Sequence, residues 1–159
     1  LEGEQAVDLL PWLWGACRMS PKNLNAYLNG AYVLAHMLHK PAEARSLLEE
    51  GVRQNPNTPE LDFSLAEIAL NVQGDAASAE RWFASARTKC LPVQASAARA
   101  EELLLLRLRS LFYLGFVAKQ RGDLGRVQAC LEEASSLEPG HRVVEDLRAL
   151  LKPKESRQP

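Results

Sequence analysis

The 159-residue sequence lacks the features typical of β-sheet, membrane and nucleic-acid-binding proteins. Runs of valine, isoleucine and threonine, the residues that favour strands, are nearly absent. No stretch reaches the roughly 18 uninterrupted apolar residues of a membrane span, so we expect no membrane insertion by this segment. Nineteen basic and twenty acidic side chains leave a net charge of −1, which excludes a general electrostatic attraction to nucleic acid or to an anionic membrane.

Patterns for catalysis and metal binding are missing as well. The sequence has no Gly-x-Ser-x-Gly elbow and no phosphate-binding loop. His36 and His39 are three residues apart, but zinc needs three or four ligands and no further donor is placed by the sequence to complete such a site. Adjacent carboxylates such as Glu101 and Glu102 point about 100° apart on a helix and are expected to face solvent. We therefore expect no enzyme activity, no metal site and no cofactor.

Cysteine is also scarce. Cys17, Cys90 and Cys130 are odd in number and widely spaced, which is typical of free thiols in a reducing compartment. The cytoplasm is thus favoured for this segment. The first residue is Leu1 and not methionine, so a targeting or anchor segment upstream of it stays open.

What the sequence has in abundance is helix-forming residues arranged with a repeated spacing. A Gly-Asp turn at residues 74–75 is followed by Ala79, Phe83 and Ala86, which lie on one face of a helix. This alternation of methyl, ring and methyl groups lets a second helix approach closely. The same spacing recurs in three other places: Leu9, Leu13 and Ala16; Ala44, Leu48 and Gly51; Val127, Leu131 and Ala134. The successive offsets are 35, 35 and 48 residues, and each copy is followed by a proline: Pro21, Pro56, Pro92 and Pro139.

A partner helix precedes three of these copies. Its apolar positions repeat at the same offsets: Leu28, Ala31 and Ala35; Phe63, Ala66 and Leu70; Leu111, Leu114 and Ala118. Turns separate the two helices at residues 39–41, 74–75 and 122–123. In the last two turns, glycine permits a positive φ at the helix end and aspartate can cap the next helix. Each unit is therefore expected to be a helix, a turn and a second helix.

Over roughly residues 5–151 this pattern resembles the tetratricopeptide repeat family. The resemblance rests on the Gly-Asp turn and on the alanine, large apolar, alanine and proline residues at the intervals given above. It implies an all-α fold in which antiparallel helix-turn-helix repeats stack as a short right-handed α-solenoid with a C-terminal capping helix. Tyr32 and Glu67 depart from the family pattern, because they stand where it has a small residue; Gly115 alone fits.

The expected organisation is a lone N-terminal helix followed by three repeats. The boundaries are 5–22 for the lone helix, 24–57, 59–92 and 108–139 for the repeats, 93–107 for a helical insertion and 141–151 for the capping helix. Trp12 and Trp14 are expected to cover the open end, and residues 1–4 and 152–159 to be disordered. The insertion should continue into the next first helix, giving one helix of about 25 residues. Its apolar residues Leu103, Leu104, Leu105 and Leu106 form a candidate assembly surface, for instance in a homodimer.

The resemblance implies a non-catalytic scaffold that binds a protein or peptide partner in the concave groove formed by the first helices. The candidate groove residues are Asn29, Val33, His36, Leu61, Ser64, Ile68, Asn71, Arg109, Phe112, Phe116 and Lys119. Apolar residues at the centre of the groove would supply binding energy, and Asn29, Asn71 and Arg109 would fix the register of the partner. Alternatively, Phe112 and Phe116 pack beneath the capping helix or the N-terminal helix.

Two other functions stay open. The extended helix over residues 93–121 could serve as an assembly or oligomerisation module. The basic residues along it also suggest a pentatricopeptide-like RNA binder, although interleaved acidic residues disfavour that interpretation and we expect no nucleic-acid partner. Binding of a chaperone C-terminal carboxylate is not expected, because Arg109 is the single residue that keeps the chemistry of that subtype.

Overall fold

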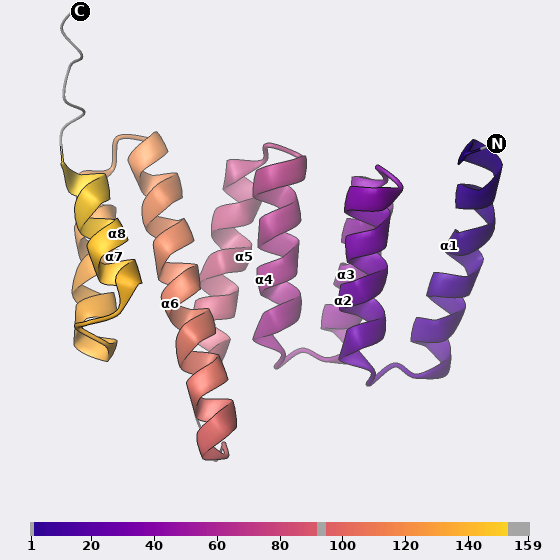
Figure 1. Cartoon of the computed structure of the whole chain (residues 1–159), viewed down its shortest axis with the longest axis horizontal. Helices are drawn as coiled ribbons and strands as arrows, with labels where there is room; N and C mark the ends of the chain where they lie inside the picture. Colours follow the sequence, from indigo (N-terminus) through magenta and orange to yellow (C-terminus); the bar gives the residue numbers. More distant parts are fainter. Residues whose placement is uncertain (1, 92–94, 153–159) are drawn as a thin grey trace, which may run out of the picture. The chain divides into compact units, whose positions relative to one another are not determined.

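Helices form the regular structure of the computed structural model, which describes residues 2–91 and 95–152, with the backbone alone for residues 2–10. In chain order the elements are α1 (Glu2–Met19), α2 (Leu24–Tyr32), η1 (Val33–Met37), α3 (Pro41–Gln54), α4 (Pro59–Glu67), η2 (Ile68–Val72), α5 (Ala76–Lys89), α6 (Ala97–Gln120), α7 (Leu124–Leu137) and α8 (Arg142–Leu151) (Figure 1). No strand occurs among the described residues. The predicted all-α class is confirmed, and the solenoid arrangement stays a prediction.

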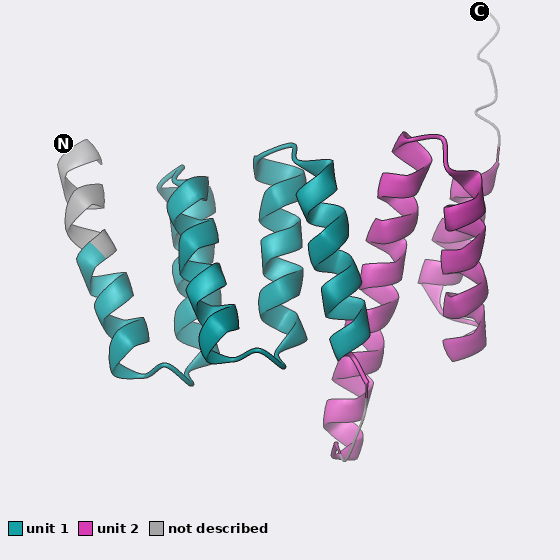
Figure 2. Ribbon diagram, turned by 180° about the vertical axis from the view of Figure 1, so that it is seen from behind, with its two compact units in different colours: residues 1–89 teal, residues 90–159 magenta. Residues whose placement is uncertain are grey.

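The chain divides into two compact units, residues 1–89 and residues 90–159 (Figure 2). In unit 1, each of the helices α1 to α5 packs against the next one along the chain, and the first helices α2 and α4 also contact each other. In unit 2, α6 packs against both α7 and α8. Within each unit, helices that follow one another are therefore neighbours in space, as short connections between antiparallel helices require.

The predicted repeat offsets appear in the turns between paired helices. His39, Gly74 and Gly122 have φ values of 53°, 67° and 77°, and they are spaced by the predicted 35 and 48 residues. Each is the left-handed residue that ends a first helix. His39 is the one non-glycine residue with positive φ in the described part of the chain. Asp75 and Asp123 follow the two glycines and cap α5 and α7 by accepting hydrogen bonds from the backbone N–H groups of Ser78 and Arg126.

The turns after the second helices recur in the same way. A backbone N–H donates to a carbonyl oxygen three residues earlier in three equivalent places: Asn23 to Ser20, Thr58 to Asn55, and His141 to Glu138. A proline occupies the second position of each of these turns: Pro21, Pro56 and Pro139. Proline favours this position because its fixed φ suits it. The prolines therefore follow the second helices because they form the turns to the next helix.

We call the apolar face at this repeated spacing on each second helix its seam. The seams of α3, α5 and α7 are buried. The residues with no exposed surface are Ala44, Leu48, Ala79, Phe83, Ala86, Val127 and Ala134, while Leu131 is 9% exposed. The Phe83 ring meets Phe63 of α4 edge to face, with centroids 5.3 Å apart. A Cβ atom on Gly51 would lie 2.9 Å from the Tyr27 ring of α2, so this glycine allows close approach. These contacts show that the seams of α3 and α5 pack on the first helices α2 and α4.

Both ends of the array differ in detail from the prediction. Helix α1 begins at Glu2 and not at Gln5, so the expectation of disorder at residues 2–4 is wrong, and it continues through Pro11. Trp14 packs partly against the core of unit 1, but Trp12 is 76% exposed and does not cover the end as predicted. Helix α6 is continuous over 24 residues, close to the predicted length, and begins at Ala97 after the N-cap Ser96. Residues 92–94 and the predicted tail beyond 152 lie outside the described residues.

Replacing His39 by glycine is expected to stabilise unit 1. The left-handed conformation costs a non-glycine residue roughly 1–2 kcal/mol, of which the greater chain entropy of glycine in the unfolded state offsets a part. We expect a net gain of about 0.5 kcal/mol for His39→Gly in urea denaturation. As a control, Gly74→Ala should lose about 1 kcal/mol, because a Cβ there meets nothing within 4 Å and backbone strain is the whole effect. A loss of stability in His39→Gly would contradict this account.

The cap of α5 predicts a pH dependence of stability. Hydrogen bonds from Ser78 lower the pKa of Asp75 in the folded chain. A depressed folded pKa stabilises the native state above the unfolded pKa of about 3.9, and this contribution is lost as the pH falls through the folded value. We therefore expect the difference in Tm between the wild type and Asp75→Asn to shrink between about pH 5 and about pH 2. A difference independent of pH would show that the charge of Asp75 plays no part.

Candidate functional site

A small open cavity lies between the two first helices of unit 1, at the crossing of α2 and η1 with α4 and η2. It measures about 70 Å³ and is lined by Leu28, Ala31, Tyr32, His36, Ser64, Glu67 and Ile68. Three of the predicted groove residues, His36, Ser64 and Ile68, are among these. The floor is aliphatic, and the remaining side chains bring a phenol, an imidazole, a hydroxyl and a carboxylate to one place.

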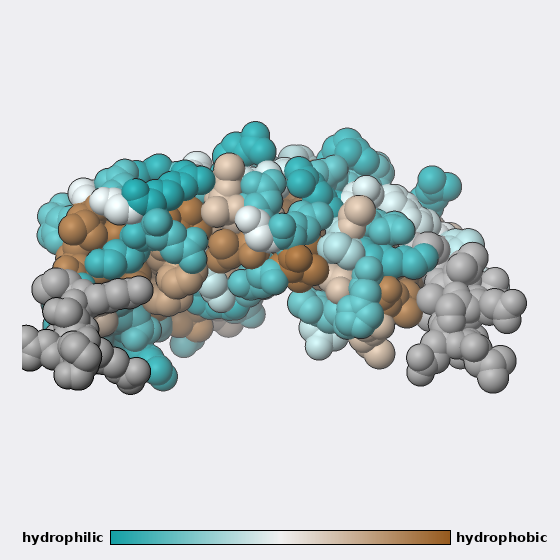
Figure 3. Space-filling view, turned by 90° about the horizontal axis from the view of Figure 1, so that it is seen from above, coloured by the Kyte–Doolittle hydropathy of each residue, from teal (hydrophilic) through white to brown (hydrophobic). Residues whose placement is uncertain are grey.

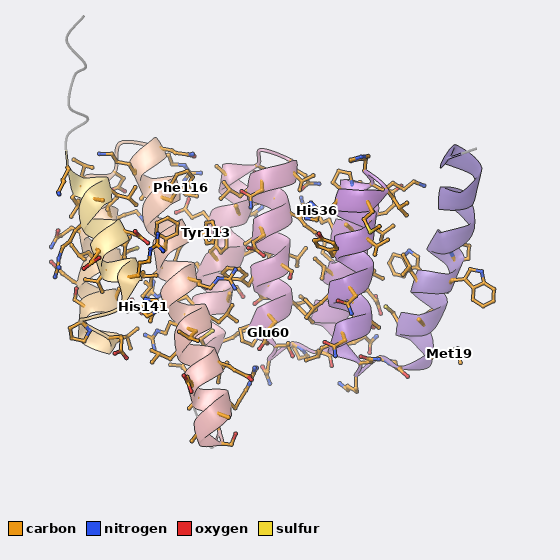
Figure 4. All side chains as sticks on the ribbon, viewed as in Figure 1. Met19, His36, Glu60, Tyr113, Phe116 and His141 are labelled. Carbon is orange, nitrogen blue, oxygen red and sulfur yellow. The ribbon has the colours of Figure 1, made fainter. Side chains whose placement is uncertain are left out.

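An aromatic pair forms one side of this cavity. The ring centroids of Tyr32 and His36 are 4.9 Å apart and the rings are tilted by 41°. Tyr32 is 61% exposed, and His36, labelled in Figure 4, is exposed as well. The two residues are one helical turn apart, so the α2–η1 helix places both rings on the same side. They form a polar, accessible edge beside the aliphatic floor.

Unit 2 has the equivalent helix crossing, and there it is closed. The offset between the first and third helix-turn-helix units, 83 residues, relates Tyr32 to Gly115 and relates Ser64 and Glu67 to Leu147 and Leu150. A Cβ atom on Gly115 would lie 2.5 Å from Leu147 and 3.9 Å from Leu150. Helices α6 and α8 therefore pack directly against each other at this point. The departure of Tyr32 and Glu67 from the family pattern thus coincides with a polar cavity in place of an apolar contact.

The other predicted groove residues of unit 1 have mixed surroundings. Asn29 and Asn71 are exposed, and Val33 is half-buried. Ile68 is 6% exposed but lines the cavity. The prediction for Leu61 is wrong: this side chain has no exposed surface, because it belongs to the hydrophobic core of unit 1. A partner could not reach it.

The predicted residues of unit 2 share one helix, α6. Phe112 lies edge-on to Tyr113 with centroids 5.5 Å apart and stacks on Phe116 at 6.4 Å. Phe112 and Phe116 are both half-buried, so each keeps some accessible surface. Arg109 is exposed, and the ammonium group of Lys119 lies 3.5 Å from the backbone oxygen of Lys152. These four residues form a separate aromatic and basic set in unit 2.

The candidate assembly surface on α6 is less apolar than predicted. Leu103 is 7% exposed and belongs to the buried residues, so its assignment to a surface is wrong. Leu104 and Leu106 are half-buried, and Leu105 is 44% exposed. One exposed leucine among the four does not make a continuous apolar patch. On the one face seen in the space-filling view, hydrophilic side chains cover much of the surface and apolar residues emerge in separate patches (Figure 3).

A buried ion pair joins the two helices of the second repeat, and the sequence analysis missed it. Asp62 of α4 has no exposed surface. Its Oδ2 accepts a hydrogen bond of 2.6 Å from the Ser85 hydroxyl and lies 2.6 Å from the Lys89 ammonium nitrogen, both on α5. Its Oδ1 has no hydrogen-bond partner. Ser85 and Lys89 are four residues apart on one helix face, which is the one signal in the sequence that could have suggested a shared partner.

The described residues give little support for other kinds of functional site. No group of three or more His, Cys, Asp or Glu residues there could hold a metal ion. None of the helices described combines the length and apolar character needed to cross a membrane. None of the three cysteines forms a disulfide, and all three are buried. Burial raises the pKa of the Cys17 thiol, which makes its reactive thiolate scarcer.

Comparison with known proteins assigns neither a family nor a function to this chain. No family model matches the chain, and no curated protein matches it either. The likeness to tetratricopeptide repeats therefore rests on the residue pattern. The function must be argued from the site itself.

Breaking the Asp62–Lys89 pair should lower the free energy of unfolding strongly, whereas replacing both residues by apolar ones should lower it little. Lys89→Met leaves a fully buried carboxylate with the Ser85 hydroxyl alone, and we expect a loss of roughly 2–4 kcal/mol in urea denaturation. The double variant Asp62→Leu with Lys89→Met should recover to within about 1 kcal/mol of the wild type, because two apolar side chains replace the pair. Additive losses in the double variant would contradict the pairing.

Proposed function

We propose that this protein is a non-catalytic protein-interaction scaffold of the tetratricopeptide type, whose first helices bind a peptide or a helix of a partner. The observation that carries the proposal is the polar cavity at the α2–α4 crossing, at a position where unit 2 is closed by glycine and leucine. If this position served packing alone, we would expect an apolar contact there like the one in unit 2. Polar side chains there weaken the packing, and binding gives a reason for them.

The chemistry of the cavity suits one anchoring side chain of a peptide. A volume of about 70 Å³ admits a small group, and the aliphatic floor of Leu28, Ala31 and Ile68 would receive its apolar part. The Tyr32 hydroxyl and the Ser64 hydroxyl would exchange hydrogen bonds with its polar end. One anchor gives little affinity, so a partner would also extend over the exposed Asn29 and Asn71 along the same helices.

The two alternative functions have less support. An assembly surface on α6 would need its leucines exposed, and Leu103 is buried. An RNA-binding surface on α6 would need a continuous row of accessible cations. Arg109 and Arg121 are exposed, but Arg107 donates to Glu133 of α7 at 2.7 Å and is partly buried with it, which interrupts the row. We therefore favour a polypeptide partner.

The proposal is tested by selecting peptides from a random displayed library on the full chain. The double variant Ser64→Leu with Glu67→Leu places the two leucines of unit 2 in the cavity, so we expect the selected peptides to bind it at least about tenfold more weakly, as loss of one good anchor would give. Circular dichroism should show that the double variant stays folded, so that weaker binding reports on the cavity.

Arg53→Ala, at an exposed position on α3, serves as the matched control and should leave peptide affinity unchanged. Peptides that bind the double variant as tightly as the wild type, or a library that yields no binder, would overturn the proposed site.

A further inference from the structure

One face of α1 exposes large apolar side chains in a row. Trp12 is 76% exposed and Met19 is 87% exposed, and Gly15 and Ala16 lie between them at helical spacing. Together with Pro11 they line an open apolar depression of about 440 Å³. Figure 4 shows Met19 projecting from α1 on the side away from the other helices of unit 1. Exposed apolar surface of this kind marks an interaction site.

The repeat register shows what kind of neighbour this face lacks. Two successive offsets of 35 residues relate Trp12 and Ala16 of α1 to Trp82 and Ala86 of α5. Ala86 has no exposed surface and Trp82 packs partly against the core of unit 1. Helix α4 lies on α5, with Phe63 against Phe83 at 5.3 Å. Helix α1 thus has the sequence of a second helix. On the face that a first helix would contact, Ala16 and Met19 are exposed, while Leu13, the equivalent of Phe83, is half-buried and packs partly against the core of unit 1.

We propose that this face of α1 is a docking site for an amphipathic α-helix that runs antiparallel to α1 and takes the place that α4 takes on α5. The contact would continue the packing already present between α2 and α3 and between α4 and α5. This is a second surface of the molecule, and it does not depend on the cavity between α2 and α4.

The residues of α1 also define the chemistry of the docked helix. On α5, Ser85 and Lys89 hold the buried carboxylate of Asp62. The equivalent residues of α1 are Gly15 and Met19, which offer neither a hydroxyl nor a cation. A carboxylate at the position of Asp62 would therefore be buried without a partner, at a high free-energy cost. The docked helix must carry an apolar residue there, followed by a bulky one where α4 has Phe63.

The first helices of this chain do not satisfy the site in their folded state. In unit 1, α2 is already packed on α3 and α4 on α5, and in unit 2, α6 is packed on α7 and α8, so none of these first helices has its packing face free for a second copy. The occupant we infer is a helix that carries its own open apolar face. Self-pairing of two copies through α1 is the competing outcome, and the experiment separates it.

The test uses labelled synthetic peptides of residues 58–73, titrated with the full chain and followed by fluorescence anisotropy. One peptide has the native sequence and the other carries Asp62→Leu. We expect the Asp62→Leu peptide to bind the wild-type chain at least about tenfold more tightly than the native peptide. Ala16→Arg in the chain should abolish this binding, whereas Ala129→Arg, at an exposed alanine of α7, should not.

A reciprocal change in the chain distinguishes docking of the helix in this register from nonspecific hydrophobic binding. The chain variant Gly15→Ser with Met19→Lys recreates the α5 partners of Asp62, so it should reverse the preference and bind the native peptide more tightly. Circular dichroism should show that the variants stay folded, since the altered positions lie on an unpacked face. Equal affinity for the two peptides, an unchanged preference in the reciprocal variant, or self-association of the wild-type chain that Ala16→Arg removes would overturn the proposal.

Discussion

The structure depends on one constraint: the seam of each second helix must be covered by a first helix. A helix of 14 residues, such as α3, α5 or α7, is marginal in water without tertiary contacts. Small residues at the ends of the seam and a large one at its centre let a neighbouring helix approach closely, as Gly51 does beneath Tyr27. Turns, caps and prolines recur at fixed offsets because each unit solves this packing problem in the same way.

The sequence predicts those parts of the fold that follow from helical spacing. The seams around Phe83 and Leu131 are buried as expected, because apolar residues at intervals of three and four can only share one face. Spacing does not reveal how deeply a neighbour covers that face, and this is why Leu61 and Leu103 were assigned to surfaces although both are buried. Contacts between helices are also hidden. Asp62 contacts Ser85 and Lys89, which lie at least 23 positions away in the sequence, and no local pattern predicts these contacts.

The equivalent helix crossings, α2 with α4 in unit 1 and α6 with α8 in unit 2, have different chemistry. In unit 2 the ideal Cβ of Gly115 would meet Leu147 at 2.5 Å, and no space is left. In unit 1 the equivalent positions are Tyr32 and Ser64, and an open cavity lies between them. The difference lies in these side chains and also in the backbone, because the segments that end the first helices of unit 1, Val33–Met37 and Ile68–Val72, are π-helical, whereas α6 is α-helical as far as Gln120. Part of the candidate site could thus be recognised in the sequence, as a departure from the repeat pattern, although its depth and its lining by Leu28 and Ala31 could not.

The two candidate surfaces of unit 1 differ in how well water can hydrate them when no partner is bound. Water can hydrate the hydroxyl groups of Tyr32 and Ser64, so the cavity is compatible with a stable free protein. The face of α1 has no such groups: Trp12 and Met19 expose mostly carbon, and burying a side chain of this size is worth roughly 1.5–3 kcal/mol. Covering α1 therefore brings a gain from burial alone, whereas the cavity requires a partner with matching polar groups. The first surface favours stable association, and the second favours selective and reversible recognition.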